Sequence, residues 1–147
     1  MAKHCVTGSS GRIGRNIVDL LARDHAVVGL DRSPAPSTHV IADICREDAL
    51  KRAFEGCECV FHVAALHAPH VDAVSDKEFE RINVEGTEKV LRCAEQQGAA
   101  HVVLTSTTAL YGYAAQDEER ATWITEQTVP QPRTIYHRTK LAAEEIA

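Results

Sequence analysis

The chain has no apolar run that approaches the roughly 18 residues of a membrane-spanning helix. Its first ten residues, MAKHCVTGSS, lack the apolar stretch of a secretory signal peptide and lead directly into a glycine-rich motif. No block of like charge stands out, and the formal net charge of −5 argues against a basic nucleic-acid-binding face. We therefore expect a cytoplasmic protein that binds neither membranes nor nucleic acids.

The cysteines do not form the pattern of a disulfide framework or of a metal site. They are odd in number and scattered along the chain, at positions 5, 45, 57, 59 and 93. Cys57 and Cys59 could form half of a metal site, but no second close pair completes it. We expect five reduced thiols that behave as small hydrophobes, and no bound metal.

Apolar segments that resemble strands alternate with helical patterns along 147 residues, the size of one domain. The two strands expected last are apolar along most of their length, which is typical of parallel strands buried on both faces. The sequence therefore predicts an α/β fold, a doubly wound parallel sheet of about five strands with helices on both faces. Strands are expected at 3–7, 26–31, 39–44, 59–65 and 101–106, and helices at 13–21, 46–56, 76–97 and 134–147, the last after a polar loop with Pro130 and Pro132.

The segment TGSSGRIG, residues 7–14, lies between the first strand and the first helix. Gly8, Gly11 and Gly14 would allow a tight turn, a close approach of the backbone to a pyrophosphate, and close packing of helix on strand. The start of the helix favours an anion, and Arg12, followed by Ile13, could add a charge-assisted contact. The alternative is a glycine-rich turn that binds nothing, but its position after a strand favours a dinucleotide site.

Asp31 ends the second expected strand, 23 residues after Gly8. A carboxylate there can accept hydrogen bonds from the adenosine ribose hydroxyls and would repel a 2′-phosphate, which favours NAD over NADP. Arg32 leaves the alternative open, because an arginine could pair with that phosphate.

Five motifs in order resemble the extended short-chain dehydrogenase/reductase family, the NAD-dependent sugar epimerases and dehydratases with a Rossmann-like fold. They are TGSSGRIG, HVAA (62–65), NVEGT (83–87), TSTTALYG (105–112) and YHRTK (136–140). The resemblance implies that Asp43 and Ile44 lie beside the adenine, that Val63, Ala64 and Ala65 line the cofactor cleft, and that Asn83 stabilises the centre of the sheet. It also implies that Thr107, Tyr136 and Lys140 are the catalytic Ser/Thr, Tyr and Lys.

The chemistry of this trio agrees with the resemblance. Tyr136 and Lys140 are four residues apart on an expected helix, so their side chains share one face. A tyrosine is a poor base at neutral pH unless a neighbouring cation stabilises its phenolate, and Lys140 would supply that cation. Thr107 would orient the substrate oxygen, although Ser106 and Thr108 in the same hydroxyl run are alternatives. Lys140 could instead form a surface ion pair with Glu144.

Four histidines lie close to these motifs, and the sequence does not fix their roles. His62, His67 and His70 follow the fourth strand, where a loop could contact substrate. His137 stands where the family has a small residue after the tyrosine, and could crowd the site or point away from it.

The resemblance implies a substrate-recognising part beyond the Tyr–Lys helix, whereas this chain ends seven residues after Lys140. We expect residues 1–147 to form an NAD-binding domain without the family's substrate domain, as a truncated chain, a split gene or a minimal protein. The function expected is an NAD-dependent oxidoreductase or epimerase/dehydratase that acts on a sugar or nucleotide sugar. The alternative is a module that binds NAD(H) without turnover. Segments 76–97 and 134–147 are the expected contacts of a homodimer.

Overall fold

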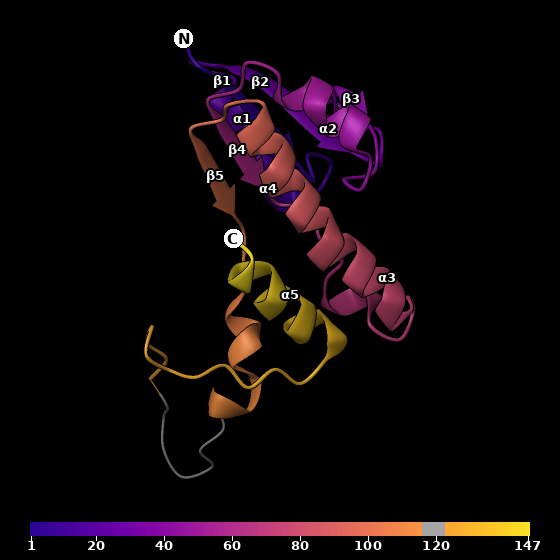
Figure 1. Cartoon of the computed structure of the whole chain (residues 1–147), viewed down its shortest axis with the longest axis vertical. Coiled ribbons are helices and arrows are strands. Elements are labelled where there is room, and N and C mark those ends of the chain that lie inside the picture. The colour runs from indigo at the N-terminus through magenta and orange to yellow at the C-terminus, as the bar shows by residue number, and fades with distance from the viewer. Residues whose placement is uncertain (116–122) are drawn as a thin grey trace.

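A single sheet of five parallel strands organises the chain, in the order β3-β2-β1-β4-β5 (Figure 1). The computed structural model describes residues 1–115 and 123–147, so part of the expected polar loop, 116–122, lies outside the described residues. The expected parallel α/β fold is confirmed. The strands are β1 (Lys3–Thr7), β2 (Ala26–Asp31), β3 (Val40–Ile41), β4 (Cys59–His62) and β5 (His101–Leu104).

The helices follow the strands in the alternation that the sequence predicted. Residues 81–85 form a π-helical turn, η2, within the segment 76–97 that was expected to be one regular helix, and Figure 1 shows α3 and α4 on either side of it as one continuous rod. The helices are α1 (Arg12–Leu21), α2 (Glu47–Phe54), α3 (Asp76–Glu80), α4 (Gly86–Gln96) and α5 (Ile135–Glu145), with short 3-10 segments η1 (Ala68–His70) and η3 (Thr108–Ala115).

Three strands are shorter than expected, and at two of them side chains take over backbone hydrogen bonds at the strand end. β3 stops at Ile41 and not at residue 44, since Asp43 turns the chain by accepting the N–H of Cys45. β4 stops at His62 and not at residue 65, since the next two N–H groups donate to the hydroxyl of Thr7. β5 ends at Leu104, two residues early.

The helices cover both faces of the sheet. The connection through α1 joins β1 to β2, whereas the connection through α2 joins β3 to β4 in the opposite direction across the sheet. Because parallel crossovers are right-handed, α1 and α2 lie on opposite faces, and α4 packs beside α2. The large side chains of Phe54 and Phe79 are fully buried in the core.

The chain passes from β1 to β2 on one side and from β3 to β4 on the other, so the strand order reverses between β1 and β4. Open parallel sheets bind ligands at this point, beyond the carboxyl ends of the strands. All five cysteines are free thiols. In the described parts of the chain, no helix is long and apolar enough to cross a membrane.

Candidate active site

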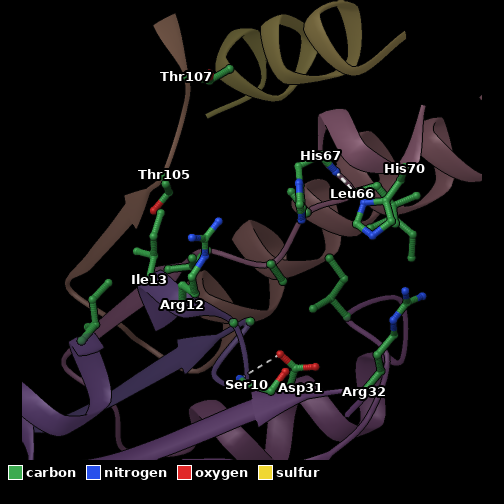
Figure 2. Close-up of a pocket in the computed structure, with 18 of the residues that line it drawn as sticks. Ser10, Arg12, Ile13, Asp31, Arg32, Leu66, His67, His70, Thr105 and Thr107 are labelled. Atoms are coloured by element: carbon green, nitrogen blue, oxygen red, sulfur yellow. Dashed lines mark hydrogen bonds between the residues drawn. The ribbon is translucent and has the colours of Figure 1, made fainter. Parts of the chain in front are cut away.

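A cavity of about 1010 Å³ lies beyond the carboxyl ends of the strands. Figure 2 shows Asp31 and Arg32 at one end of this cavity and Thr105 and Thr107 at the other. Most of the residues selected from the sequence line it. They are Gly8, Gly11, Arg12, Ile13, Asp31, Arg32, Asp43, Ile44, Val63, Ala64, Ala65, Thr107, Tyr136 and Lys140.

The glycines of the first loop are required by contact and by conformation. Gly8 has φ +72°, and a Cβ there would lie 2.7 Å from the backbone nitrogen of Ala64. A Cβ on Gly14 would lie 2.1 Å from the carbonyl oxygen of Gly8. Gly14 therefore acts by allowing α1 to pack on the loop, and does not itself line the cavity.

Helix α1 begins at Arg12, and its N-cap residue, Gly11, provides no side-chain cap. The N–H groups of a first helical turn have no partner inside the helix, and the helix dipole adds positive potential there. Arg12 and Ile13, which carry two of these groups, line the cavity. This uncapped helix start, above a cradle that any Cβ would fill, fits a pyrophosphate.

Asp31, at the end of β2, fixes the glycine-rich loop of residues 7–14 in place. One carboxylate oxygen accepts the N–H of Ser10 at 3.0 Å, as Figure 2 shows, and the other accepts the N–H of Ser33 at 2.9 Å. Each carboxylate oxygen has a second lone pair, so Asp31 can still accept from two hydroxyl groups of a ligand.

Asp43 lies in an ion cluster beside the cavity. Its carboxylate accepts from Arg81 at 2.9 Å, and Arg81 also contacts both carboxylate oxygens of Glu78 at 2.7 and 2.8 Å. Burial opposes ionisation of Asp43, but the hydrogen bonds from Arg81 and the N–H of Cys45 hold its pKa below the usual value overall. The neighbouring Ile44 is buried and closes the core beneath this end of the cavity.

Tyr136, Lys140 and Thr107 line the end of the cavity away from Asp31. Lys140 is buried, and its ammonium donates to the carbonyl oxygen of Thr105 at 2.6 Å. Burial lowers the pKa of Lys140, while Glu144 partly opposes this effect. The hydroxyl of Thr107 accepts the N–H of Ala109, whereas that of Ser106 is buried without a hydrogen-bond partner among the described residues.

The histidines near the site have separate places. His67 and His70 line the cavity, with the N–H of His67 donating to Nδ1 of His70, and their rings meet edge to face at 4.5 Å (Figure 2). His137 accepts the N–H of Arg133 at 3.2 Å and so fixes the entry to α5. His62 is fully buried beneath the cavity. Across the described residues, no cluster of three metal-ligating side chains is present.

Asn83 lies behind the cavity wall, in the π-helical turn. Its side chain holds the backbone of Leu66 through two hydrogen bonds, at 2.7 and 2.9 Å, and donates to Thr139 at 3.0 Å. Thr7 and Thr139 were not among the site residues predicted from the sequence, although each stands inside a motif, Thr7 directly before Gly8 and Thr139 directly before Lys140. Their burial was the missing information, since a threonine in a motif carries no sign of which way it points.

Comparison with known proteins agrees with this geometry. A family model described as "NAD dependent epimerase/dehydratase family" matches residues 4–147. The chain belongs to this family. Its fold also matches solved structures, among them a short-chain dehydrogenase/reductase superfamily protein from Agrobacterium tumefaciens with bound NAD, at a TM-score of 0.84 and 30% identity, covering 98% of this chain and 43% of that one. The structure of MoeE5 in complex with UDP-glucose and NAD matches at a TM-score of 0.85 and 31% identity, covering 99% and 48%.

Curated relatives of this chain differ in the substrates that their names give. L-arabinose 1-dehydrogenase (NAD(P)(+)) from Haloferax volcanii is 38% identical over 112 residues, which cover 76% of this chain and 43% of that protein. A 3-beta-hydroxysteroid dehydrogenase from Mycolicibacterium neoaurum is 31% identical over 153 residues, covering 95% and 40%. The chain thus spans less than half the length of these relatives. The family is the one expected from the motifs. NAD, the cofactor predicted from them, is bound in both of the solved structures named above.

Proposed function

We propose that this chain binds NAD in the cavity and supplies the cofactor-binding and proton-transferring half of an enzyme. The enzyme would act on a hydroxyl or keto carbon of a sugar or nucleotide sugar. One observation carries the proposal: a single cavity brings the glycine loop and Asp31 together with Tyr136, Lys140 and Thr107.

The residues at the Asp31 end of the cavity would hold the cofactor. The uncapped start of α1 would receive the pyrophosphate, with Arg12 beside it, and Asp31 the ribose hydroxyls. Asp43 and Ile44 would border the adenine, and residues 63–65 would form the floor of the cleft. When bound, NAD supplies a hydride acceptor or donor.

The residues at the other end would handle the proton. Tyr136 would take a proton from the substrate hydroxyl, or return one to a carbonyl oxygen, as general acid/base. Lys140 places a buried positive charge on the same cavity wall, where a phenolate is stabilised more strongly than in water. Thr107 would hold the substrate oxygen by a hydrogen bond.

The substrate class is supported by two relatives. MoeE5 was crystallised with UDP-glucose, and the Haloferax volcanii relative is named for L-arabinose. Both ligands carry the secondary hydroxyl groups on which this proton chemistry would act.

The first test is calorimetric titration of the chain with NAD and NADP. We expect NAD to bind more tightly, Asp31→Asn to weaken NAD about tenfold by removing the charge on the ribose acceptor, and Arg32→Ala, a matched control next to it, to leave NAD binding unchanged. Failure of a folded sample to bind either dinucleotide would refute the proposal. Tighter binding of NADP that depends on Arg32 would reverse the assigned preference.

A second candidate is an NAD(H)-binding module without turnover. Reduction of NAD in the presence of L-arabinose or UDP-glucose, followed by NADH absorbance, separates the two. Because an epimerase or dehydratase returns the hydride to its substrate and accumulates no NADH, the sugars themselves are also analysed for epimerised or dehydrated products. Binding of NAD with neither NADH nor a changed sugar, across a panel of aldoses and UDP-sugars, would favour the module.

We also propose that segments 76–97 and 134–147 form a homodimer contact. Within one chain, α3 and η2 already pack against α5, so the two segments present one combined surface. Sedimentation velocity of the chain would show a dimer, and a strictly monomeric chain at high concentration would contradict this contact.

A further inference from the structure

A chain of buried polar side chains runs behind the cavity, from the end of β1 to α5. It begins at Thr7, whose hydroxyl lies 2.7 Å from Nδ1 of His62. Nε2 of His62 lies 2.9 Å from the hydroxyl of Thr87, which donates to the carbonyl oxygen of Asn83 at 2.7 Å. The amide of Asn83 then reaches Thr139 at 3.0 Å, and each of these five residues is at most 3% exposed.

Counting the donors around Thr7 fixes the direction of its bond to His62. The hydroxyl oxygen accepts the N–H groups of Val63 and Ala64, at 3.2 and 3.3 Å, which occupies both of its lone pairs. Its own hydrogen is then free to donate, and Nδ1 of His62 is its acceptor. Nδ1 therefore carries a lone pair and not a proton.

The other ring nitrogen of His62 must then carry the proton. Nε2–H donates to Thr87, and the hydroxyl of Thr87 passes its own hydrogen to Asn83. The Thr7 hydroxyl, the His62 ring N–H and the Thr87 hydroxyl then each donate to one acceptor. Only the neutral Nε2–H tautomer of His62 allows this arrangement. Burial and the nearby ammonium of Lys140 act in the same direction, lowering the pKa of His62 to about 3.

The π-helical turn places Asn83 where it can bond to both neighbours in this series of buried polar side chains, Thr87 and Thr139. The N–H of Gly86 reaches back to the carbonyl of Arg81, five residues earlier, which widens the turn around Asn83. The backbone of Asn83 meets Thr87, while its side chain meets Leu66 and Thr139. Thr139 is the residue before Lys140, and its hydroxyl also bonds the carbonyl of Ile135 one turn earlier.

We infer that His62 is a positioning residue, held as the neutral Nε2–H tautomer, that joins the strand exit under the cofactor cavity to the helix carrying Tyr136 and Lys140. Through Thr7 it sets the backbone of Val63 and Ala64, against which Gly8 packs. Through Thr87 and Asn83 it sets α5. Both halves of the proposed active site thus depend on one uncharged imidazole.

The assignment rests on the proposed function only for its catalytic meaning, since the tautomer itself is measurable without a ligand. Long-range nitrogen–carbon-bound-proton NMR of histidine-labelled protein distinguishes the two neutral tautomers and the cation. For His62 we expect the Nε2–H pattern, unchanged between pH 5 and pH 8, a range well above about 3. An Nδ1–H pattern or a cation in that range would overturn the inference.

Thr87→Val tests the coupling, because it keeps the shape of the side chain and removes the hydroxyl between His62 and Asn83. Thr87→Ser, which retains that hydroxyl, is the matched control. We expect Thr87→Val to shift the amide signals of Val63 and Ala64 on one side and of Thr139 and Lys140 on the other. We expect Thr87→Ser to restore both groups of signals.

Shifts confined to α4 would overturn the coupling. If Thr87→Val does not fold, the same comparison is made with His62→Gln, whose side-chain amide can still donate to Thr87, against His62→Phe, which cannot. In the variants that fold, loss of the hydroxyl would weaken NAD about tenfold. Absence of NAD binding in the unaltered chain would refute the proposed function, and the tautomer and signal pattern would still decide the role of His62.

Discussion

The ammonium of Lys140 on α5 donates a hydrogen bond of 2.6 Å to the carbonyl oxygen of Thr105, just beyond β5. This bond ties the helix of the proposed catalytic pair to the end of the sheet. An ammonium has three donors, so two remain for ligands in the cavity that Lys140 lines. The charge is thus held in place by a backbone dipole.

Replacing Lys140 by methionine separates stability from catalysis. Lys140→Met keeps the apolar stem, and relief from burying a charge offsets the lost hydrogen bond, so we expect the free energy of unfolding to change by less than about 1 kcal/mol. Turnover would fall at least about 100-fold. Urea unfolding and NADH formation measure the two effects.

Lys89→Met is the control for this substitution, because the Lys89 ammonium donates to the carbonyl oxygen of Cys45 and Lys89 is not among the residues that line the cavity. It should preserve both properties. The pKa of Lys140 is lower in the folded chain than the usual 10.5, so the unfolded chain binds more protons just below that pH. The unaltered chain should therefore gain stability relative to Lys140→Met as pH rises toward 10.5, and the opposite slope would contradict a buried ammonium.

The sequence predicted the succession of strands and helices along the chain, because that succession follows from apolar periodicity and from the positions of glycine and proline. It overestimated the length of β3, which a local turn at Asp43 ends, and of β4, whose end is decided by a distant partner. The N–H groups of Val63 and Ala64 leave the ladder for Thr7, which is more than fifty residues away in the chain. Alternation of residue types does not carry that information.

At the candidate site, too, part of the arrangement could be predicted from the sequence and part depends on the fold. Motif spacing selected the residues that meet a ligand, since Gly8, Asp31 and Lys140 all line the cavity. It did not reveal the π-helical turn, which helical periodicity at 76–97 conceals. The support behind the cavity, above all His62 and Thr139, depends on burial and hydrogen-bond direction, which only a folded arrangement defines.

Adding one methyl group at Gly14 should damage the site more than adding it at Gly98. The new Cβ would lie 2.1 Å from the carbonyl oxygen of Gly8, so α1 must move away from the loop. We expect Gly14→Ala to lose about 3 kcal/mol or more of stability and to abolish NAD binding. Gly98→Ala is the control, because it meets open space and strains only a φ of +73°, at a cost of about 1 kcal/mol with NAD binding intact. Equal effects of the two substitutions in calorimetry would contradict close packing at Gly14.

The ion cluster around Arg81 should contribute to stability above acidic pH. The pKa of Asp43 is lower in the folded chain than its usual 3.8, so its contribution is present above that pH and is lost as pH falls through the folded value. Asp43→Asn should cost about 1 kcal/mol at pH 7, a figure reduced because about a third of each side chain is exposed. Below the folded pKa the two proteins should converge.

Asp48→Asn provides a matched control for that experiment. Asp48 pairs with Arg46 at a surface where both side chains are more than half exposed, so solvent screens the pair and little change is expected. Thermal unfolding across a pH series measures both variants. A pH-independent effect of Asp43→Asn would show that its charge is not the source of the stability.

Substitutions at the neighbouring residues Ser106 and Thr107 should differ in their effect on turnover. Both line the cavity, but the oxygen of the Thr107 hydroxyl accepts the N–H of Ala109. If Thr107 orients the substrate oxygen, Thr107→Ala should lower turnover about 100-fold while Thr107→Ser preserves it. Ser106→Ala should have a small effect, because its buried hydroxyl has no hydrogen-bond partner in the described parts of the chain. NADH formation from the sugar panel, with NAD affinity measured in parallel, decides between them. A larger loss in Ser106→Ala would transfer the role to Ser106, one residue closer to the carbonyl of Thr105 that holds Lys140.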